Sequence, residues 1–343
     1  MTEVSKWKRA SRLTPRSLLV ATCVVLAPQP VTAQDPIASI GTPAHGAKPL
    51  VSRSSANLET SLRGPLQIKL QAEYPDSFRS GVDIFLKPSE GWVSPEVFEW
   101  WVARVEPKGL NRSGAERLFS GISSESRVFS TDEQRICAVV GASRNLLGSR
   151  YGRLIDAHDV VFRVNRAPTR HFASDVGEKT THHVAWPTVL SPGVADREAF
   201  LLFNPLTLHT PNLFDWMLLL VEHKLPWDPE RVRIISPEFV KYLDEYWTRG
   251  RGDFPSTGLI ALMIAVHVCD EVDVFGFGAD ALGRWDRYYE DDPKEPTGLH
   301  PAGFEGQLRQ DMEAKGIVKV FLGNRSADGA GFRGFVIDES DEN

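Results

Sequence analysis

The strongest constraint on the fold is a pair of short apolar runs in the middle of the chain, each ending in residues that suit a turn. Residues 136–140 are followed by Gly141 and Ser143, and residues 160–164 are followed by Asn165. Continuous apolar runs of this length are typical of strands buried on both faces of a parallel sheet. The carboxyl ends of such strands share one edge, where α/β proteins bind nucleotides. We therefore expect an α/β fold with a ligand site at this edge.

Two common phosphate-binding signatures do not match this segment. A G-x-G-x-x-G motif needs glycine where the chain has Ala142 or Ser143. A P-loop needs Gly-Lys-Ser/Thr where the chain has Gly-Ser-Arg at residues 148–150. An ordinary dinucleotide or ATP site is therefore weakly supported, although two polar strand ends side by side can hold one nucleotide.

A second informative segment begins at Ser256. Ser256 or Thr257 can cap a helix over residues 259–268, and the N–H groups of its first turn, at Gly258, form an anion site. A plain capped core helix has the same pattern, and the fragment alone favours that interpretation over an anion site. A strand over residues 272–275 is expected to follow.

Together these segments resemble the sialylmotifs of the eukaryotic sialyltransferases, glycosyltransferase family 29. The large motif is matched by Cys-Ala-Val-Val-Gly at 137–141, Asp-x-His-Asp at 156–159, Arg-x-Asn-Arg-Ala-Pro-Thr at 163–169 and Asp-Val-Gly-x-Lys-Thr-Thr at 175–181. The small motif is matched by Pro-Ser-Thr-Gly at 255–258, Cys-Asp-Glu at 269–271 and Gly-Phe-Gly-Ala-Asp at 276–280. Within the family, the spacing is most similar to the β-galactoside α2,3-sialyltransferases.

The resemblance implies a Rossmann-like α/β architecture, the variant GT-A glycosyltransferase fold, in a single catalytic domain that we place at residues 86–343. Residues 34–85, rich in Pro, Gly, Ser and Ala up to about residue 65, are interpreted as a flexible stem. Residues 17–33 form a short apolar segment behind a basic tail at residues 1–16. The residues alone favour a cleaved signal peptide, whereas the family implies an uncleaved signal-anchor.

Both interpretations of the N-terminus lead to the secretory pathway. The resemblance implies a single-pass type II protein of the Golgi membrane with a lumenal catalytic domain, or a secreted protein if the segment is cleaved. Asn111 and Asn324 begin glycosylation sequons, which agrees with this route. The chain has 39 basic and 45 acidic side chains and a net charge of −6, so nothing indicates nucleic-acid binding.

The chain contains three cysteines, of which Cys23 lies in the apolar N-terminal segment. The resemblance implies a disulfide between Cys137 and Cys269, which join the two sialylmotifs in this family. Two buried free thiols are the alternative, and they are less expected in a lumenal protein.

Two further segments resemble the shorter motifs of the family. Residues 285–290 are similar to the third motif, but Arg287 stands where the family carries histidine. Arginine is always cationic and offers a fork of donors, so it can replace histidine at a donor phosphate; the alternative is that Arg287 is a surface charge and donor binding is altered. His300 and Glu305 match the final motif, and His300 directly precedes a helix expected to run to residue 315. A second departure is Ala142, where the family usually has asparagine.

The resemblance implies inverting transfer of sialic acid from CMP-sialic acid to a galactose hydroxyl of a glycoprotein or glycolipid, with His300 as general base. It assigns the donor phosphate and nucleotide to Ser143, Asn145, Asn165, Ser256, Thr257, Gly258, Gly278 and Arg287. No cofactor is expected. A monophosphate leaving group needs little neutralisation, which fits the lack of a convincing metal-binding Asp-x-Asp; we interpret Asp273 as a solvated charge.

Two alternatives stay open at the level of the sequence. Ala142 removes an amide that could contact the donor, so the substrate could be another CMP-activated keto-sugar acid such as Kdo or Kdn. Ala142 and Arg287 together also suit a catalytically silent lumenal protein that binds a glycan or nucleotide. The presence of His300 argues against the silent protein.

Overall fold

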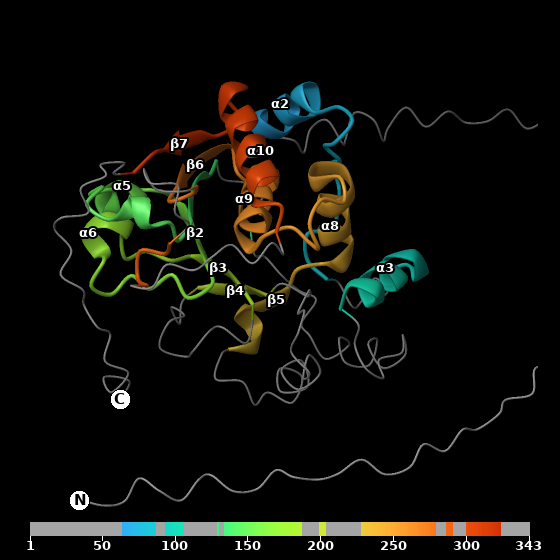
Figure 1. Cartoon of the computed structure of the whole chain (residues 1–343), viewed down its shortest axis with the longest axis horizontal. Helices are drawn as coiled ribbons and strands as arrows, with labels where there is room; N and C mark the ends of the chain where they lie inside the picture. Colours follow the sequence, from blue (N-terminus) through green and yellow to red (C-terminus); the bar gives the residue numbers. More distant parts are fainter. Residues whose placement is uncertain are drawn as a thin grey trace, which may run out of the picture. The chain divides into compact units, whose positions relative to one another are not determined.

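A parallel sheet forms the centre of the fold (Figure 1). The computed structural model describes residues 64–86, 93–105, 129, 134–186, 199–203, 228–278, 286–290 and 300–323, all within the unit Arg53–Asn343. In these residues seven strands pair in the order β5-β4-β3-β2-β1-β6-β7. Their bounds are β1 Ile136–Val140, β2 Val160–Val164, β3 His182–Ala185, β4 Phe200–Phe203, β5 Val232–Ile234, β6 Glu271–Phe275 and β7 Lys319–Phe321.

The strand order reverses direction once, next to β1. The chain moves outward from β1 to β5, then returns and places β6 against the free side of β1, with Val140 opposite Phe275. On its other side β1 pairs with β2, with Val140 opposite Arg163. All of these pairings are parallel, so the α/β fold expected from the apolar runs is confirmed. The carboxyl ends of the neighbouring strands β1 and β6 therefore form the switch point, where such sheets bind ligands.

One face of the sheet packs against α9, a helix that is apolar on all sides. Its 12 residues run from Thr257 to Val268 and lie against β1, β2, β3 and β6. α9 is buried all round because α2 covers its outer side, where the Gln67 amide donates to the carbonyls of Val266 and Cys269. The helices of this layer include α2 Pro65–Glu73, α3 Pro95–Val105, α8 Pro237–Tyr242, the π-helix η5 Leu243–Thr248 and α9.

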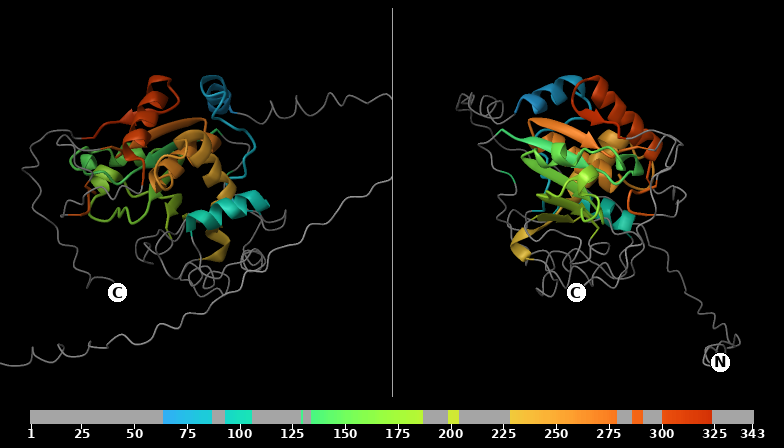
Figure 2. Two further views of the ribbon diagram at one scale, coloured as in Figure 1. Left: turned by 45° about the vertical axis from the view of Figure 1, so that its right-hand side comes forward. Right: turned by 90° about the vertical axis from the view of Figure 1, so that its left-hand side faces the viewer.

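The opposite face is covered by short helices, and the sheet lies between the two layers (Figures 1 and 2). Side chains alternate between the faces: Cys137 and Val139 point toward the α9 layer, while Ala138 and Val140 point the other way. The short helices are η2 Arg144–Leu146, α5 Gly152–Asp156 and α6 Ala173–Val176, with η4 Pro229–Arg231 before β5.

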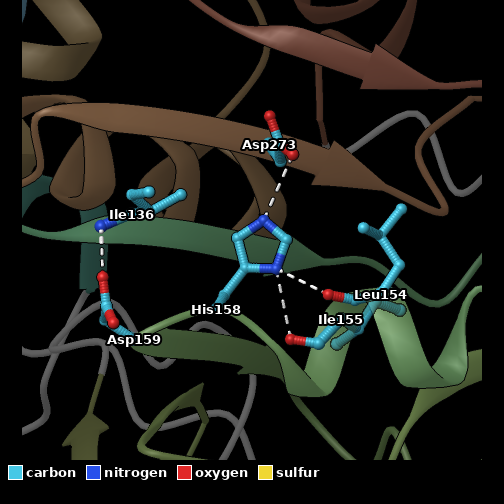
Figure 3. Close-up of polar contacts among 6 residues, drawn as sticks. All are labelled: Ile136, Leu154, Ile155, His158, Asp159 and Asp273. Atoms are coloured by element: carbon cyan, nitrogen blue, oxygen red, sulfur yellow. Dashed lines mark hydrogen bonds and ion pairs between the residues drawn. The ribbon is translucent and has the colours of Figure 1, made fainter.

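Asp273 on β6 is not the solvated charge that we expected. Its carboxylate lies 3.2 Å from Nε2 of His158, whose Nδ1 lies 2.9 Å from the carbonyl of Leu154 (Figure 3). Carbonyl and carboxylate oxygens only accept hydrogen bonds, so both ring nitrogens carry protons in this arrangement. The buried partner could not be found from sequence, because His158 and Asp273 are 115 residues apart.

The disulfide implied by the resemblance is present. Cys137 on β1 is bonded to Cys269, which caps the C-terminus of α9, and their Cα atoms are 6.2 Å apart. The bond lies on the α9 face of the sheet, whereas the His158–Asp273 pair lies on the other face. A disulfide on one face of the sheet and an ion pair on the other therefore both stabilise the β1–β6 region.

Part of the predicted stem is folded. α2 lies inside residues 34–85, and its Leu66 and Leu70, one helical turn apart, are buried in the main core. Pro65 suits the first turn of a helix, which starts α2 where we expected the stem to continue. The folded region thus begins before residue 86. The predicted tail and signal segment, Asn111 and Asn324 lie outside the described residues.

Among the residues that the structure describes, no helix combines the length and the apolar character needed to cross a membrane.

Candidate active site

A cavity of about 290 Å³ opens at the carboxyl ends of β1 and β6. Four segments form most of its lining: residues 141–143 after β1, residues 276–278 after β6, the start of α9, and the first turns of α10, which runs from Ala302 to Ala314. Arg287 and its neighbour Asp286 add to the rim. The cavity therefore occupies the switch point of the sheet, where the sequence predicted a ligand site.

Glycine allows the two strand-end turns to approach closely. Gly141 donates to the carbonyl of Phe275 at 2.8 Å, and Ser143 donates to that of Gly276 at 3.0 Å. A Cβ atom at Gly141 would lie 2.4 Å from the carbonyl oxygen of Gly276, which no side chain tolerates. Gly278 has φ of +95°, a conformation that favours glycine. These glycines are required for the shape of the cavity floor.

The carboxylate of Glu305 accepts two hydrogen bonds at the N-terminus of α9. Ser256 is the N-cap, and its Oγ accepts from the N–H of Leu259 at 3.1 Å. The same hydroxyl donates to Glu305 at 2.6 Å, and the Ser256 N–H donates to the other Glu305 oxygen at 2.8 Å. Burial raises the pKa of Glu305, although the hydrogen bonds from Ser256 and the nearby His300 act in the opposite direction. Ser256, Gly258 and Leu259 of this helix start line the cavity.

His300 lines the cavity two residues before α10 begins. Its Nδ1 lies 3.2 Å from the carbonyl oxygen of Phe254, and the two rings meet edge to face with centroids 4.8 Å apart. Because a carbonyl can only accept, Nδ1 carries the proton in this contact. A neutral His300 ring then has its lone pair on Nε2, as a general base requires.

Arg287 and Ala142, the two departures from the family motifs, lie next to each other. Arg287 forms an antiparallel bridge with Ser143, and the N–H of Tyr288 donates to the carbonyl of Ala142 at 3.0 Å. Nη1 of Arg287 contacts Oε1 of Glu290 at 2.7 Å. Burial acts to lower the pKa of Arg287, but Tyr289 and Glu290 outweigh it and raise that pKa, so the guanidinium stays cationic.

Some of the residues predicted to bind the donor substrate line the cavity, and the others do not. Lining residues from that set are Ser143, Ser256, Gly258, Gly278 and Arg287, together with His300. Thr257, Asn145 and Asn165 are not among the lining residues. Asn145 is buried and its amide donates to the carbonyl of Phe277 at 3.4 Å, whereas Oδ1 of Asn165 accepts from the Trp186 N–H at 3.3 Å.

Two cavity residues received no role from the sequence. Glu305 holds the start of α9, and Arg309 is buried beside Gly278, where a Cβ would lie 3.7 Å from its Nη2. Both side chains line the cavity and are four residues apart on α10. That four-residue spacing, on the helix expected to follow His300, was the available signal. Within the described part of the chain, no three His, Cys, Asp or Glu side chains gather as a metal site.

Comparison with known proteins identifies the family. A family model described as glycosyltransferase family 29 (sialyltransferase) matches residues 93–317. CMP-N-acetylneuraminate-beta-galactosamide-alpha-2,3-sialyltransferase 1 of Homo sapiens is 33% identical over 274 residues, covering 75% of this chain and 80% of that protein. The corresponding sialyltransferase 2 of Rattus norvegicus is 37% identical over 248 residues, covering 68% and 71%.

A solved structure extends the similarity to the fold. The crystal structure of a mammalian sialyltransferase in complex with Gal-beta-1-3GalNAc-ortho-nitrophenol matches with a TM-score of 0.65 and 28% identity, covering 74% of this chain and 95% of that one. Both the sequence motifs and the parallel sheet thus have counterparts in one family. The chain belongs to glycosyltransferase family 29 and is a sialyltransferase.

Proposed function

We propose that the protein transfers sialic acid from CMP-sialic acid to a galactose hydroxyl of a glycan, with inversion and with His300 as general base. The observation that carries the proposal is the commitment of His300 Nδ1 to the Phe254 carbonyl, which leaves Nε2 as the acceptor nitrogen of a residue on the cavity wall. The names of the relatives give a beta-galactosamide and an alpha-2,3 linkage, and the solved structure is a complex with Gal-beta-1-3GalNAc-ortho-nitrophenol. These names support a galactose acceptor and an α2,3 linkage for this protein.

The reaction needs one proton transfer and one bond exchange. His300 Nε2 takes the proton from the acceptor hydroxyl while that oxygen attacks the anomeric carbon of the sialic acid. The bond from this carbon to the phosphate oxygen breaks, and CMP leaves with the electron pair. Inversion follows because the attacking oxygen and the leaving phosphate lie on opposite faces of the sugar.

Negative charge grows on the phosphate as CMP leaves. The Ser143 hydroxyl, the Arg287 guanidinium and the backbone of Gly258 and Gly278 surround the cavity and can stabilise this charge. A monophosphate with an arginine beside it needs no metal, so we propose a metal-independent reaction. Arg287 in place of histidine also removes a titratable group from the phosphate site.

The other residues predicted to bind the donor substrate are proposed to hold its nucleotide. Asn165 keeps its amide nitrogen as a donor, because its Oδ1 accepts from Trp186. Asn145 fixes the turn after β6 through the Phe277 carbonyl, and Thr257 sits in the first turn of α9. We also propose the variant GT-A form of the α/β fold for this domain.

The proposed site of action is the lumen of the Golgi. The Cys137–Cys269 disulfide supports an oxidising compartment, since such bonds are rare in the cytosol. The basic tail, apolar segment and shortened stem would then hold the catalytic domain on the lumenal side of the membrane, or release it if the segment is cleaved.

The test is CMP release by the purified protein with CMP-sialic acid and a galactose-terminated acceptor in EDTA. We expect acceptor-dependent turnover, and a fall of about 10²- to 10⁴-fold in kcat for His300→Ala with donor affinity retained. Turnover with CMP-Kdo but not CMP-sialic acid would refute the donor. Ala142 and Arg287 favour one rival, a silent binding protein, and CMP binding without any turnover would establish it.

A further inference from the structure

The ion pair between Arg287 and Glu290 lies at the rim of the cavity, in a tight turn. The N–H of Glu290 donates to the carbonyl of Arg287 at 3.2 Å, and the two side chains meet at 2.7 Å. The side chain of Glu290 is 22% exposed and that of Arg287 is 45% exposed. The carboxylate is therefore the more enclosed of the two groups.

Glu290 is also anchored through its backbone. Nη1 of Arg144 donates to the Glu290 carbonyl at 3.3 Å, and the Arg144 N–H donates to the carbonyl of Asp286 at 2.8 Å. These bonds attach both ends of the 286–290 segment to the turn that follows β1. Glu290 is thus a fixed point against which the long Arg287 side chain is held.

Arg287 and Ser143 pair across an antiparallel bridge, which allows both side chains to bind the same anion. Residues paired directly across an antiparallel bridge have Cβ atoms about 5 Å apart, so their side chains can contact one ligand group. A guanidinium has five N–H donors in one plane. One of them contacts Glu290, and Tyr289 is a second partner, so the plane is oriented while further donors remain.

A stabilising role does not explain this arrangement well. Ion pairs with a solvent-exposed member contribute little to folding stability. Orienting a side chain before a ligand arrives, in contrast, removes the cost of ordering it during binding. Lysine has no such planar fork, so the arrangement depends on arginine.

We propose that Glu290 is a positioning residue for donor binding: it holds the Arg287 guanidinium opposite the Ser143 hydroxyl, so that the two side chains together bind the phosphate of a cytidine monophosphate ester. The inference rests on the proposed function, because it takes that phosphate as the ligand. Glu290 acts only through Arg287 and does not touch the donor.

The experiment measures binding of CMP and of cytidine by calorimetry for the wild type and for Glu290→Ala, Glu290→Gln, Arg287→Ala and the double variant Arg287→Ala/Glu290→Ala. We expect Glu290→Ala to weaken CMP binding about fivefold to tenfold and to leave cytidine binding unchanged, because only CMP carries the phosphate. Glu290→Gln keeps an acceptor oxygen and retains most of the affinity. In the Arg287→Ala background, loss of Glu290 has no further effect.

A matched control is Glu245→Ala, which removes the carboxylate from another exposed ion pair, with Lys241 on α8. We expect Glu245→Ala to change neither the affinity for CMP nor the affinity for cytidine. Equal or tighter CMP binding by Glu290→Ala would overturn the proposal and make Glu290 a competitor of the donor. An equal loss of cytidine affinity, or a loss that persists without Arg287, would show a structural role instead. A wild type that binds neither ligand would refute the donor assignment itself, and the positioning role with it.

Discussion

His158 and Asp273 form an ion pair across β1, with His158 Nε2 3.2 Å from the Asp273 carboxylate (Figure 3). His158 lies just before β2 and Asp273 lies on β6, and β1 is the strand between them. Burial acts to lower the pKa of His158, but the hydrogen bonds to Asp273 and to the Leu154 carbonyl outweigh it and raise that pKa. A raised pKa means that the folded state binds the proton more tightly than the unfolded state. The pair therefore stabilises the protein fully below about pH 6.5, the ordinary value for histidine, and less as pH rises through the folded pKa.

His158→Gln tests this pH dependence. We expect the variant to lose about 1.5–3 kcal/mol of unfolding free energy at pH 5.5, because a hydrogen bond between charged groups is removed. The loss should be smaller at pH 8, because the contribution of the ion pair declines as pH rises through the raised pKa of His158. Urea unfolding of both proteins at the two pH values, with the disulfide intact, measures the difference. A loss that is equal at both pH values would contradict a charged His158.

His267 on α9 should behave in the opposite way. It is partly buried, its Nδ1 lies 2.6 Å from the Met263 carbonyl, and burial lowers its pKa to about 4. Between about pH 4 and 6.5 the unfolded chain binds this proton and the folded protein does not, so stability falls on acidification. The destabilisation caused by His267→Gln should therefore shrink from pH 7 to pH 5 in the same unfolding assay. A destabilisation that grows toward pH 5 would show that the buried ring is protonated.

Ser256 should affect both stability and donor binding. Ser256→Ala removes the N-cap of α9 and the hydroxyl bond to Glu305, which should cost about 1–2 kcal/mol and weaken CMP binding. Ser236 gives a matched control, because it caps α8 through the Glu238 N–H and does not line the cavity. Thermal unfolding should shift similarly for Ser236→Ala, with CMP affinity unchanged. Equal CMP affinity in both variants would disprove the role of this helix start.

Removing the disulfide should destabilise the protein strongly. The bond joins residues 132 positions apart, and the chain-entropy model assigns about 4 to 5 kcal/mol to a loop of this size. Replacing Cys137 and Cys269 together by alanine should lower the melting temperature and, because β1 and β6 carry the cavity floor, weaken CMP binding. Calorimetry of the variant beside the reduced wild type measures both effects. An unchanged melting temperature would mean that packing alone holds this region.

Local patterns predicted three strands of the sheet, β1, β2 and β6, and the main helix, α9. Residues 136–140 and 160–164 are strands because uninterrupted apolar runs suit a sheet covered on both faces. Ser256 begins α9 because its hydroxyl caps the helix, which sequence alone could not separate from Thr257. α2 was missed because its sequence alternates polar and apolar residues with little helical periodicity, and only its contact with α9 buries Leu66 and Leu70.

Contacts between distant segments account for the other differences. Glu305 reaches Ser256 across 49 residues, and Asp273 reaches His158 across 115. No local pattern encodes such a pair; it depends on the strand order that brings β6 back to β1. The cavity residues from the sialylmotifs were found because family resemblance carries this long-range information, which periodicity and capping do not.

The Cys137–Cys269 bond also makes the chain between its ends a closed covalent ring. A protease that cuts one peptide bond between residues 144 and 268 opens that ring without releasing a fragment. The turn after β1 and the turn after β6 stay on one covalent molecule. Such a nicked enzyme runs as a single band until it is reduced, then separates into two pieces, each carrying part of the cavity lining.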